Sequence, residues 1–167
     1  MSEKSREDII NEFLKDDAKK NALDFVAYLR ANEIAPPSNS GNIYLYQNRV
    51  ICKITIKGAD DIAAPWMIWF SDGEGDKLGL CSVPEDERLK EFAWAHINTC
   101  ANFSSNGRDC GCDKAPGRSA AVFGRQFDNV CHSTLSFINP NADSLVYIKK
   151  LVDLMKIGIN RNNEVSK

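Results

Sequence analysis

The sequence predicts an α+β domain, in which an antiparallel sheet of about five strands is covered by an N-terminal helical segment, a middle helix and a C-terminal helix. Two observations lead to this fold class. Apolar side chains recur at helical spacing in three segments, and they alternate along short segments between those three. The resulting order is helix, three strands, helix, two strands, helix, and the connections between strands suit antiparallel pairing.

The N-terminal segment predicts one long helix or two short helices. Ser5, followed three residues later by Asp8, resembles a capping box, which marks a helix start. A polar stretch at residues 15–21 interrupts the apolar pattern, and the helical region should end before Pro36. The apolar positions are Ile9, Ile10, Phe13, Leu14, Ala22, Phe25, Val26 and Leu29.

Three strands are expected next. Residues 43–46 and 49–57 are separated by Gln47 and Asn48, which suit a hairpin turn. Side chains in the second strand alternate between apolar and polar, so one face should be buried and the other exposed to water. Residues 65–70 are apolar on both faces, which is typical of a central strand or of one whose second face lines a pocket.

A middle helix is predicted after Ser82 and Glu85, which resemble a second capping box. The spacing of its apolar residues is i, i+3, i+4, i+7, i+8 and i+11, a single buried stripe. We therefore expect His96 and Cys100 on that stripe, one helical turn apart. The six positions are Leu89, Phe92, Ala93, His96, Ile97 and Cys100.

Two further strands, at residues 120–125 and 129–138, precede the C-terminal helix. Asn139 and Pro140 suit the N-cap and first position of that helix, and Gly158 suits its end. We expect residues 1–160 to form a single α+β domain and residues 161–167 to be a polar, frayed tail.

Composition narrows the classes of function. Hydrophobic residues make up 43% of the chain and charged residues 26%, which is typical of a globular protein. The net charge of -2 gives no basic excess, so we expect no nucleic-acid partner. No apolar run approaches about 20 residues, so we expect no membrane span. The first residues lead directly into a helical pattern without a signal peptide, which favours the cytoplasm.

The segment from His96 to His132 contains four of the six cysteines and both histidines. In a reducing cytoplasm such cysteines favour metal binding, reactive thiols or plain burial over disulfides. Zinc prefers four thiolate or imidazole ligands. The candidate ligands are Cys100, Cys110, Cys112 and Cys131, with His96 as a substitute for one of them. The Cys-Gly-Cys spacing departs from the usual C-x₂-C pattern of zinc sites.

Two alternative readings of these cysteines stay open. Free cysteine behaves as a small hydrophobic residue and is commonly buried, and a core histidine commonly donates to a backbone carbonyl. The other alternative is thiol chemistry, since Arg108, Lys114 and Arg118 could lower a nearby thiol pKa. Along a regular strand, Cys131 should face the core while His132 faces the opposite way, so these two residues should not form a catalytic pair.

A ligand-binding pocket on the second face of the sheet is a separate hypothesis. Aromatic residues cluster in the predicted strands, where they usually pack in a core. The alternative is an aromatic pocket that also contains a polar group. The candidate ligand-binding residues are Tyr46, Lys53 and Trp66.

The stretch CGCDKAPGRSAAVFGRQFDNVCHSTLSFINP, together with the helix DFVAYLR, resembles uncharacterised small proteins of anaerobic, clostridia-like bacteria. The resemblance covers most of the chain and implies no activity, ligand or catalytic residue. The residues themselves favour a non-enzymatic small-molecule-binding or regulatory domain with a structural cysteine cluster that could hold zinc. The alternative is a thiol-dependent redox sensor or an enzyme with a cysteine nucleophile.

Overall fold

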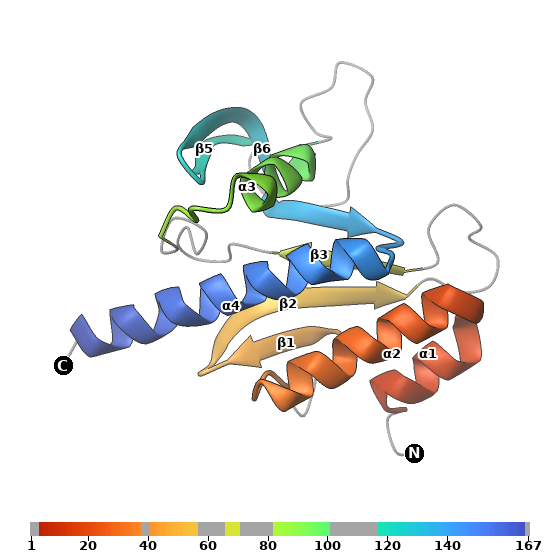
Figure 1. Cartoon of the computed structure of the whole chain (residues 1–167). Coiled ribbons are helices and arrows are strands. Elements are labelled where there is room, and N and C mark those ends of the chain that lie inside the picture. The colour runs from red at the N-terminus through yellow and green to blue at the C-terminus, as the bar shows by residue number, and fades with distance from the viewer. Residues whose placement is uncertain (1–3, 38–40, 57–65, 71–81, 101–116, 166–167) are drawn as a thin grey trace. The chain divides into compact units, whose positions relative to one another are not determined.

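The computed structural model describes residues 4–37, 41–56, 66–70, 82–100 and 117–165 (Figure 1). Within these residues, none of the helices is both long and apolar enough to cross a membrane. The elements are α1 (Arg6–Phe13), α2 (Asp16–Ala31), β1 (Ile43–Tyr46), β2 (Arg49–Ile56), β3 (Trp66–Phe70), α3 (Glu87–Ala95), β4 (Ile97–Thr99), β5 (Arg118–Val122), β6 (Arg125–Ile138) and α4 (Ala142–Val165).

The strands form an antiparallel sheet, which confirms the predicted α+β fold class. The strand order is β1-β2-β3-β6-β4, and β5 pairs with β6 off this path. The described residues contain six strands rather than about five. The additional strand is β4, which occupies part of the segment predicted to continue the middle helix. The chain divides into two compact units, which are described separately below.

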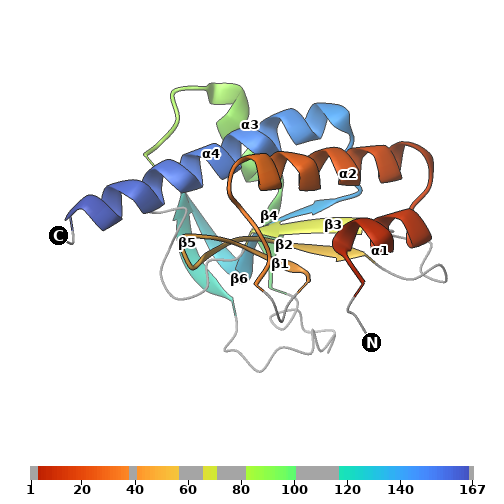
Figure 2. The same ribbon diagram turned by 90° about the horizontal axis from the view of Figure 1, so that it is seen from below.

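The first unit comprises residues 1–69 and 137–153. It contains α1, α2, β1, β2, most of β3 and the first half of α4. Figure 2 shows α2 and this half of α4 on the same face of β1, β2 and β3. The largest fully buried side chains of this unit include Phe25, Leu29, Ile51, Ile54, Trp66, Ile68 and Ile148. Their burial gives the unit an apolar core of its own.

Both N-terminal helices form as separate elements, in agreement with the second of the two predicted arrangements. Ser5 caps α1 through the predicted box: its hydroxyl oxygen accepts from the Asp8 amide at 3.1 Å, and the Asp8 carboxylate accepts from the Ser5 amide at 3.1 Å. The helices are separated at Leu14 and Lys15, and Asp16 has a positive φ of 48°. α2 ends at Ala31, before Pro36 as predicted.

The hairpin between β1 and β2 turns at Gln47 and Asn48, as predicted. Both residues have positive φ, 49° and 61°, which is the backbone of a type I′ turn. In β2, Cys52 and Ile54 are buried and Lys53 between them is exposed, so the expected alternation is present there. β3 lies between β2 and β6, which confirms that the strand apolar on both faces is central.

The second unit comprises residues 70–136 and 154–167, and its middle helix differs from the prediction. α3 is capped by Asp86, whose carboxylate accepts from the Arg88 amide at 3.1 Å, and not by Ser82. α3 ends at Ala95 with His96 as C-cap, so Cys100 is not on this helix. The β-branched residues Ile97 and Thr99 pair with β6 instead, because strand pairing outweighs the helical spacing.

β5 and β6 form a tighter hairpin than the sequence suggested. The turn is Phe123-Gly124, with φ values of 47° and 81°. β6 therefore begins at Arg125 rather than at residue 129. The register shifts between the pairs Ile97↔Leu135 and Thr99↔Val130, and this irregularity interrupts the regular alternation of side chains in β6.

α4 begins two residues later than predicted. The side-chain oxygen of Asn141 accepts from the Ser144 amide at 2.9 Å, whereas Asn139 bonds to the backbone of Trp66 at the start of β3. Gly158 lies inside α4, which continues to Val165. Along α4 the buried residues include Leu145, Ile148, Val152 and Met155, which recur at helical spacing.

Candidate ligand-binding site

A cavity of about 370 Å³ lies in the first unit, between the start of α1, the end of α2 and the chain leading into β1. We call it the α1–α2 cavity. Its volume falls in the range, roughly 300–1,000 Å³, that small-molecule sites occupy. Its lining residues are Lys4, Ser5, Arg6, Glu7, Val26, Arg30, Ile34, Ala35, Pro36, Pro37, Gly41 and Tyr44.

One part of the cavity wall is apolar. Val26 belongs to the buried stripe of α2, and Ile34 is held under the end of α2 by a hydrogen bond from its amide to the Leu29 carbonyl at 2.9 Å. Ala35 exchanges two backbone hydrogen bonds with Leu45, which fixes the segment of Pro36 and Pro37 beside β1. This part of the wall can contact a hydrocarbon group.

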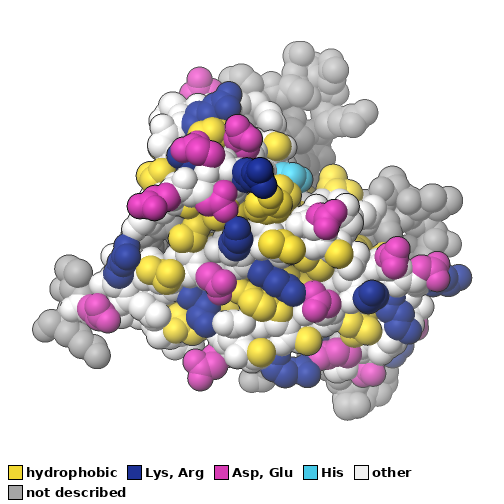
Figure 3. All heavy atoms as spheres, in the orientation of Figure 1, with side chains coloured by type: hydrophobic (Ala, Val, Ile, Leu, Met, Phe, Trp, Pro, Cys, Tyr) yellow, Lys and Arg dark blue, Asp and Glu magenta, His cyan; other side chains and the backbone are white. Residues whose placement is uncertain are grey.

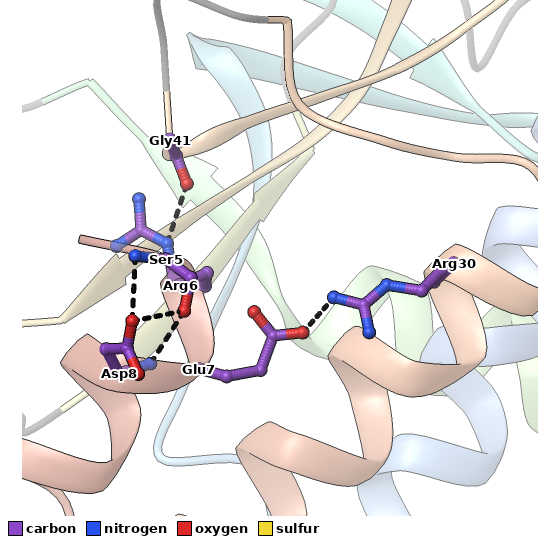
Figure 4. Close-up of polar contacts among 6 residues, drawn as sticks. All are labelled: Ser5, Arg6, Glu7, Asp8, Arg30 and Gly41. Atoms are coloured by element: carbon purple, nitrogen blue, oxygen red, sulfur yellow. Dashed lines mark hydrogen bonds and ion pairs between the residues drawn. The ribbon is translucent and has the colours of Figure 1, made fainter. Parts of the chain in front are cut away.

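The polar part of the wall comes from the start of α1 (Figure 4). Arg6 Nε donates to the Gly41 carbonyl oxygen at 2.7 Å, which ties α1 to the chain that leads into β1. Glu7 forms an ion pair with Arg30 of α2. The Ser5 hydroxyl also donates to the Asp8 carboxylate at 2.7 Å, and these hydrogen bonds from Ser5 hold the pKa of Asp8 below its usual range.

Beneath these charged groups lies Tyr44, which is only 2% exposed. Its hydroxyl has no partner that meets strict hydrogen-bond geometry, although the Arg6 guanidinium lies within hydrogen-bonding reach of it. Burial raises the pKa of Tyr44 to about 12, while the positive charge of the nearby Arg6 guanidinium acts in the opposite direction. The hydroxyl therefore stays protonated at neutral pH, as a hydrogen-bond donor close to Arg6.

The predicted zinc ligands are only partly within the described residues. Cys100 is buried just after β4, and its amide donates to the Asn129 carbonyl at 2.9 Å. Cys131 is half-buried on β6 rather than fully in the core. Cys110 and Cys112 lie outside the described residues. Among the residues that are described, no group of three or more His, Cys, Asp or Glu could hold a metal ion.

His96, the proposed substitute ligand, caps the end of α3. Its Nδ1 donates to the Phe92 carbonyl oxygen at 2.7 Å, and its ring packs at 4.5 Å, centroid to centroid, from the ring of Phe92. A hydrogen bond to a backbone carbonyl is what we expected of His96 if it has a structural role and does not bind a metal. The nitrogen that a metal would use is therefore not Nδ1 in this arrangement.

The three residues suggested for an aromatic pocket lie apart in the first unit. Tyr46 pairs with Arg49 at the hairpin end of β2, whereas Trp66 pairs with Ile56 at its other end, about 23 Å away along the strand. Trp66 is fully buried and Lys53 is exposed. The register of β2 thus separates these side chains rather than gathering them around one ligand.

Sequence reasoning missed the residues of the α1–α2 cavity, above all Arg6, Arg30 and Tyr44. For Arg6 the sequence does contain a recognisable pattern nearby, because this residue directly follows the N-cap of the capping box at the start of α1. The contact that positions Arg6 joins residues 35 positions apart, and no local pattern encodes it.

Comparisons with known proteins supply no family for this chain. No protein-family model matches it, and neither curated proteins nor solved structures gave a match. We therefore infer the function from the geometry of the chain itself.

Proposed function

We propose that this protein is a non-enzymatic small-molecule-binding or regulatory domain and that the α1–α2 cavity holds its ligand. The observation that carries the proposal is the composition of the cavity wall. The wall combines the buried apolar side chains of Val26 and Ile34 with a small set of polar groups from α1. Specific small-molecule sites usually combine a largely apolar wall with a few placed polar groups.

The net charge of -2 and the charges on the face that Figure 3 shows support a small ligand rather than a nucleic acid. Over α2 and the first half of α4, Lys and Arg side chains are interspersed with Asp and Glu (Figure 3). A nucleic-acid-binding face would instead gather positive charge along one groove or stripe. The free thiols of Cys52, Cys100 and Cys131 are compatible with a reducing cytoplasm, where we propose the protein acts.

A fragment screen by protein NMR tests the proposal. Ligands should shift the amide signals of Val26, Ile34 and Gly41, and the Ala35→Trp variant should lose these shifts because an indole would fill the cavity. Ala121→Trp, at an exposed position of β5, is the matched control and should behave like the wild type.

Two results would count against the proposal. The first is a set of shifts that lies elsewhere or survives Ala35→Trp. The second is chemical conversion of the bound ligand, detected in the ligand's own spectrum, which would overturn its non-enzymatic part.

A structural zinc site at Cys100, Cys110, Cys112 and Cys131 is the second proposal, and one observation favours it. A Cβ added at Gly117 would lie 2.6 Å from the Cβ of Cys100, so these two residues are in direct contact. Cys100 and Gly117 flank residues 101–116, the segment that contains Cys110 and Cys112. The residues on either side of that segment therefore lie next to each other, and one of them, Cys100, is a candidate zinc ligand.

Elemental analysis of the purified protein tests the zinc site. We expect one zinc per chain and a lower melting temperature after chelation, because metal binding stabilises only the folded state. Cys131→Ser should lower the zinc content, while Cys52→Ala should leave it unchanged. Metal-free protein with one rapidly alkylated cysteine would overturn the zinc site and favour thiol chemistry instead.

A further inference from the structure

We propose that the ligand of the α1–α2 cavity is a small monocarboxylate with an apolar body, whose carboxylate binds the guanidinium of Arg6. This inference rests on the proposed function of the cavity and names the class of molecule it takes. The ion pairs of the charged residues around the cavity point to this class of ligand.

Among the described residues that line the α1–α2 cavity, Arg6 is the cation without a carboxylate partner. Its side chain is half-buried, and its Nε donates to the neutral carbonyl oxygen of Gly41. It forms no ion pair with a carboxylate in the described part of the chain. A partly buried cation without a counter-charge is unfavourable, because water is displaced without an ionic replacement. A carboxylate from a ligand would supply that replacement.

The other cations of the cavity wall already have partners. Arg30 pairs with Glu7, and the Lys4 ammonium lies 2.8 Å from the Glu12 carboxylate. Asp8 is held by Ser5 in the capping box and stays ionised. Arg6 is thus the cation of the described cavity wall without a carboxylate partner, and the carboxylates of Glu7 and Asp8 lie on the same first turn of α1. This balance favours a monoanion over a phosphate dianion, which the carboxylates of Glu7 and Asp8 would repel.

The orientation of Arg6 suits a carboxylate in particular. The bond from Nε to Gly41 fixes the plane of the guanidinium, whose terminal nitrogens lie beside the Tyr44 hydroxyl. The terminal nitrogens of a guanidinium can bind a carboxylate through two parallel hydrogen bonds. Gly41 and the Arg6 guanidinium are close neighbours, since a Cβ added at Gly41 would lie at an ordinary contact distance of 3.6 Å from Arg6 Nη2. Tyr44, whose hydroxyl has no partner of normal geometry, lies near the same group.

The size and lining of the cavity describe the rest of the ligand. The apolar residues of the wall are Val26, Ile34, Pro36 and Pro37. A short aliphatic chain or a single ring can be buried there, whereas a strongly polar body would lose its hydration without gaining hydrogen bonds.

Titration of the full chain with benzoate, benzamide, hexanoate, hexanamide and inorganic phosphate, followed by NMR, tests the inference. Each carboxylate should bind about tenfold or more tightly than its neutral amide, because a hydrogen bond between two charged groups is stronger than one to a neutral group. Arg6→Gln should remove this preference, and Arg6→Lys should restore part of it. Arg88→Gln, on α3, is the matched charge control and should leave it intact.

The outcomes separate the inference from the function on which it rests. If amides bind the cavity as tightly as carboxylates, or if Arg6→Gln keeps the preference, the monocarboxylate is wrong and a small-molecule site survives. If phosphate binds more tightly than either carboxylate, the class of anion is wrong. If none of the five probes shifts a signal of the cavity residues, both proposals fall. The comparison of carboxylate and amide binding can be made with the wild type alone, so it still tests the inference if an Arg6 variant fails to fold.

Discussion

The backbone of Gly117 packs directly against the side chain of Cys100. A Cβ built on Gly117 would lie 2.6 Å from the Cβ of Cys100, 2.5 Å from the side-chain oxygen of Asn129 and 2.8 Å from its carbonyl carbon. Real Cβ atoms do not approach other heavy atoms this closely. The residue that precedes β5 must therefore be glycine for β5 and β4 to approach β6 as they do.

Gly117→Ala should destabilise the protein for this reason. The added methyl group meets backbone atoms as well as a buried side chain, so the chain must shift, and overpacking of this kind costs about 1–3 kcal/mol. Chemical denaturation would measure the change in the free energy of unfolding. Gly41→Ala is the matched control, since its Cβ would lie at an ordinary 3.6 Å from the nearest atom. Equal stabilities for the two variants would contradict the prediction.

Tyr28→Phe should also lower stability, by about 1–2 kcal/mol. The Tyr28 hydroxyl joins α2 to α4, because it lies 2.6 Å from the Asp153 carboxylate and 3.0 Å from the Lys149 carbonyl oxygen. The Phe variant keeps the ring and its packing but loses these bonds. A double-mutant cycle with Asp153→Ala would isolate the pairwise contribution of the carboxylate. No coupling between the two substitutions would show that this contact contributes nothing.

Much of the fold could be predicted because its signals are local. The capping box of Ser5 and Asp8, the hairpin turn at Gln47 and Asn48, and the central strand that is apolar on both faces all appear in short stretches of sequence. Each is decided by contacts within a few residues or by the requirement that an apolar strand be covered on both sides.

The errors arose where distant contacts outweighed local spacing. The helical pattern through Cys100 was regular, yet pairing with β6 converts Ile97 and Thr99 into a strand. The α1–α2 cavity could not be predicted for a related reason. Its charged group, Arg6, is positioned by Gly41, and neither residue carries a local signature of binding. Tertiary context thus decided both the end of α3 and the place of the candidate site.

The stability of the protein should fall at alkaline pH, in part through Tyr44. An unfolded tyrosine ionises near pH 10, whereas burial raises the pKa of Tyr44 in the folded state to about 12. Its contribution is therefore fully present below about pH 10 and is lost as the pH rises to about 12, because the unfolded state then binds fewer protons. The loss for this one group is roughly 3 kcal/mol.

Comparison of the wild type with Tyr44→Phe checks this dependence on pH. Urea denaturation at several pH values should show a shallower alkaline decrease for the variant, since phenylalanine does not ionise. The difference between the two curves isolates Tyr44 from the other groups that titrate in the same range. Parallel curves for the two proteins would contradict the prediction.

Two of the described cysteines, Cys52 and Cys131, should differ sharply in reactivity. Cys52 is completely buried in β2, and this burial raises the pKa of its thiol well above the usual range. Because the thiolate is the reactive form, Cys52 should resist alkylation in the folded protein at neutral pH. Cys131 is half-exposed on β6 and should react faster, as peptide mapping after timed alkylation would show. In denaturant the two rates should converge, which separates the effect of burial from any intrinsic difference. Rapid modification of Cys52 under native conditions would mean that β2 opens more readily than its complete burial implies.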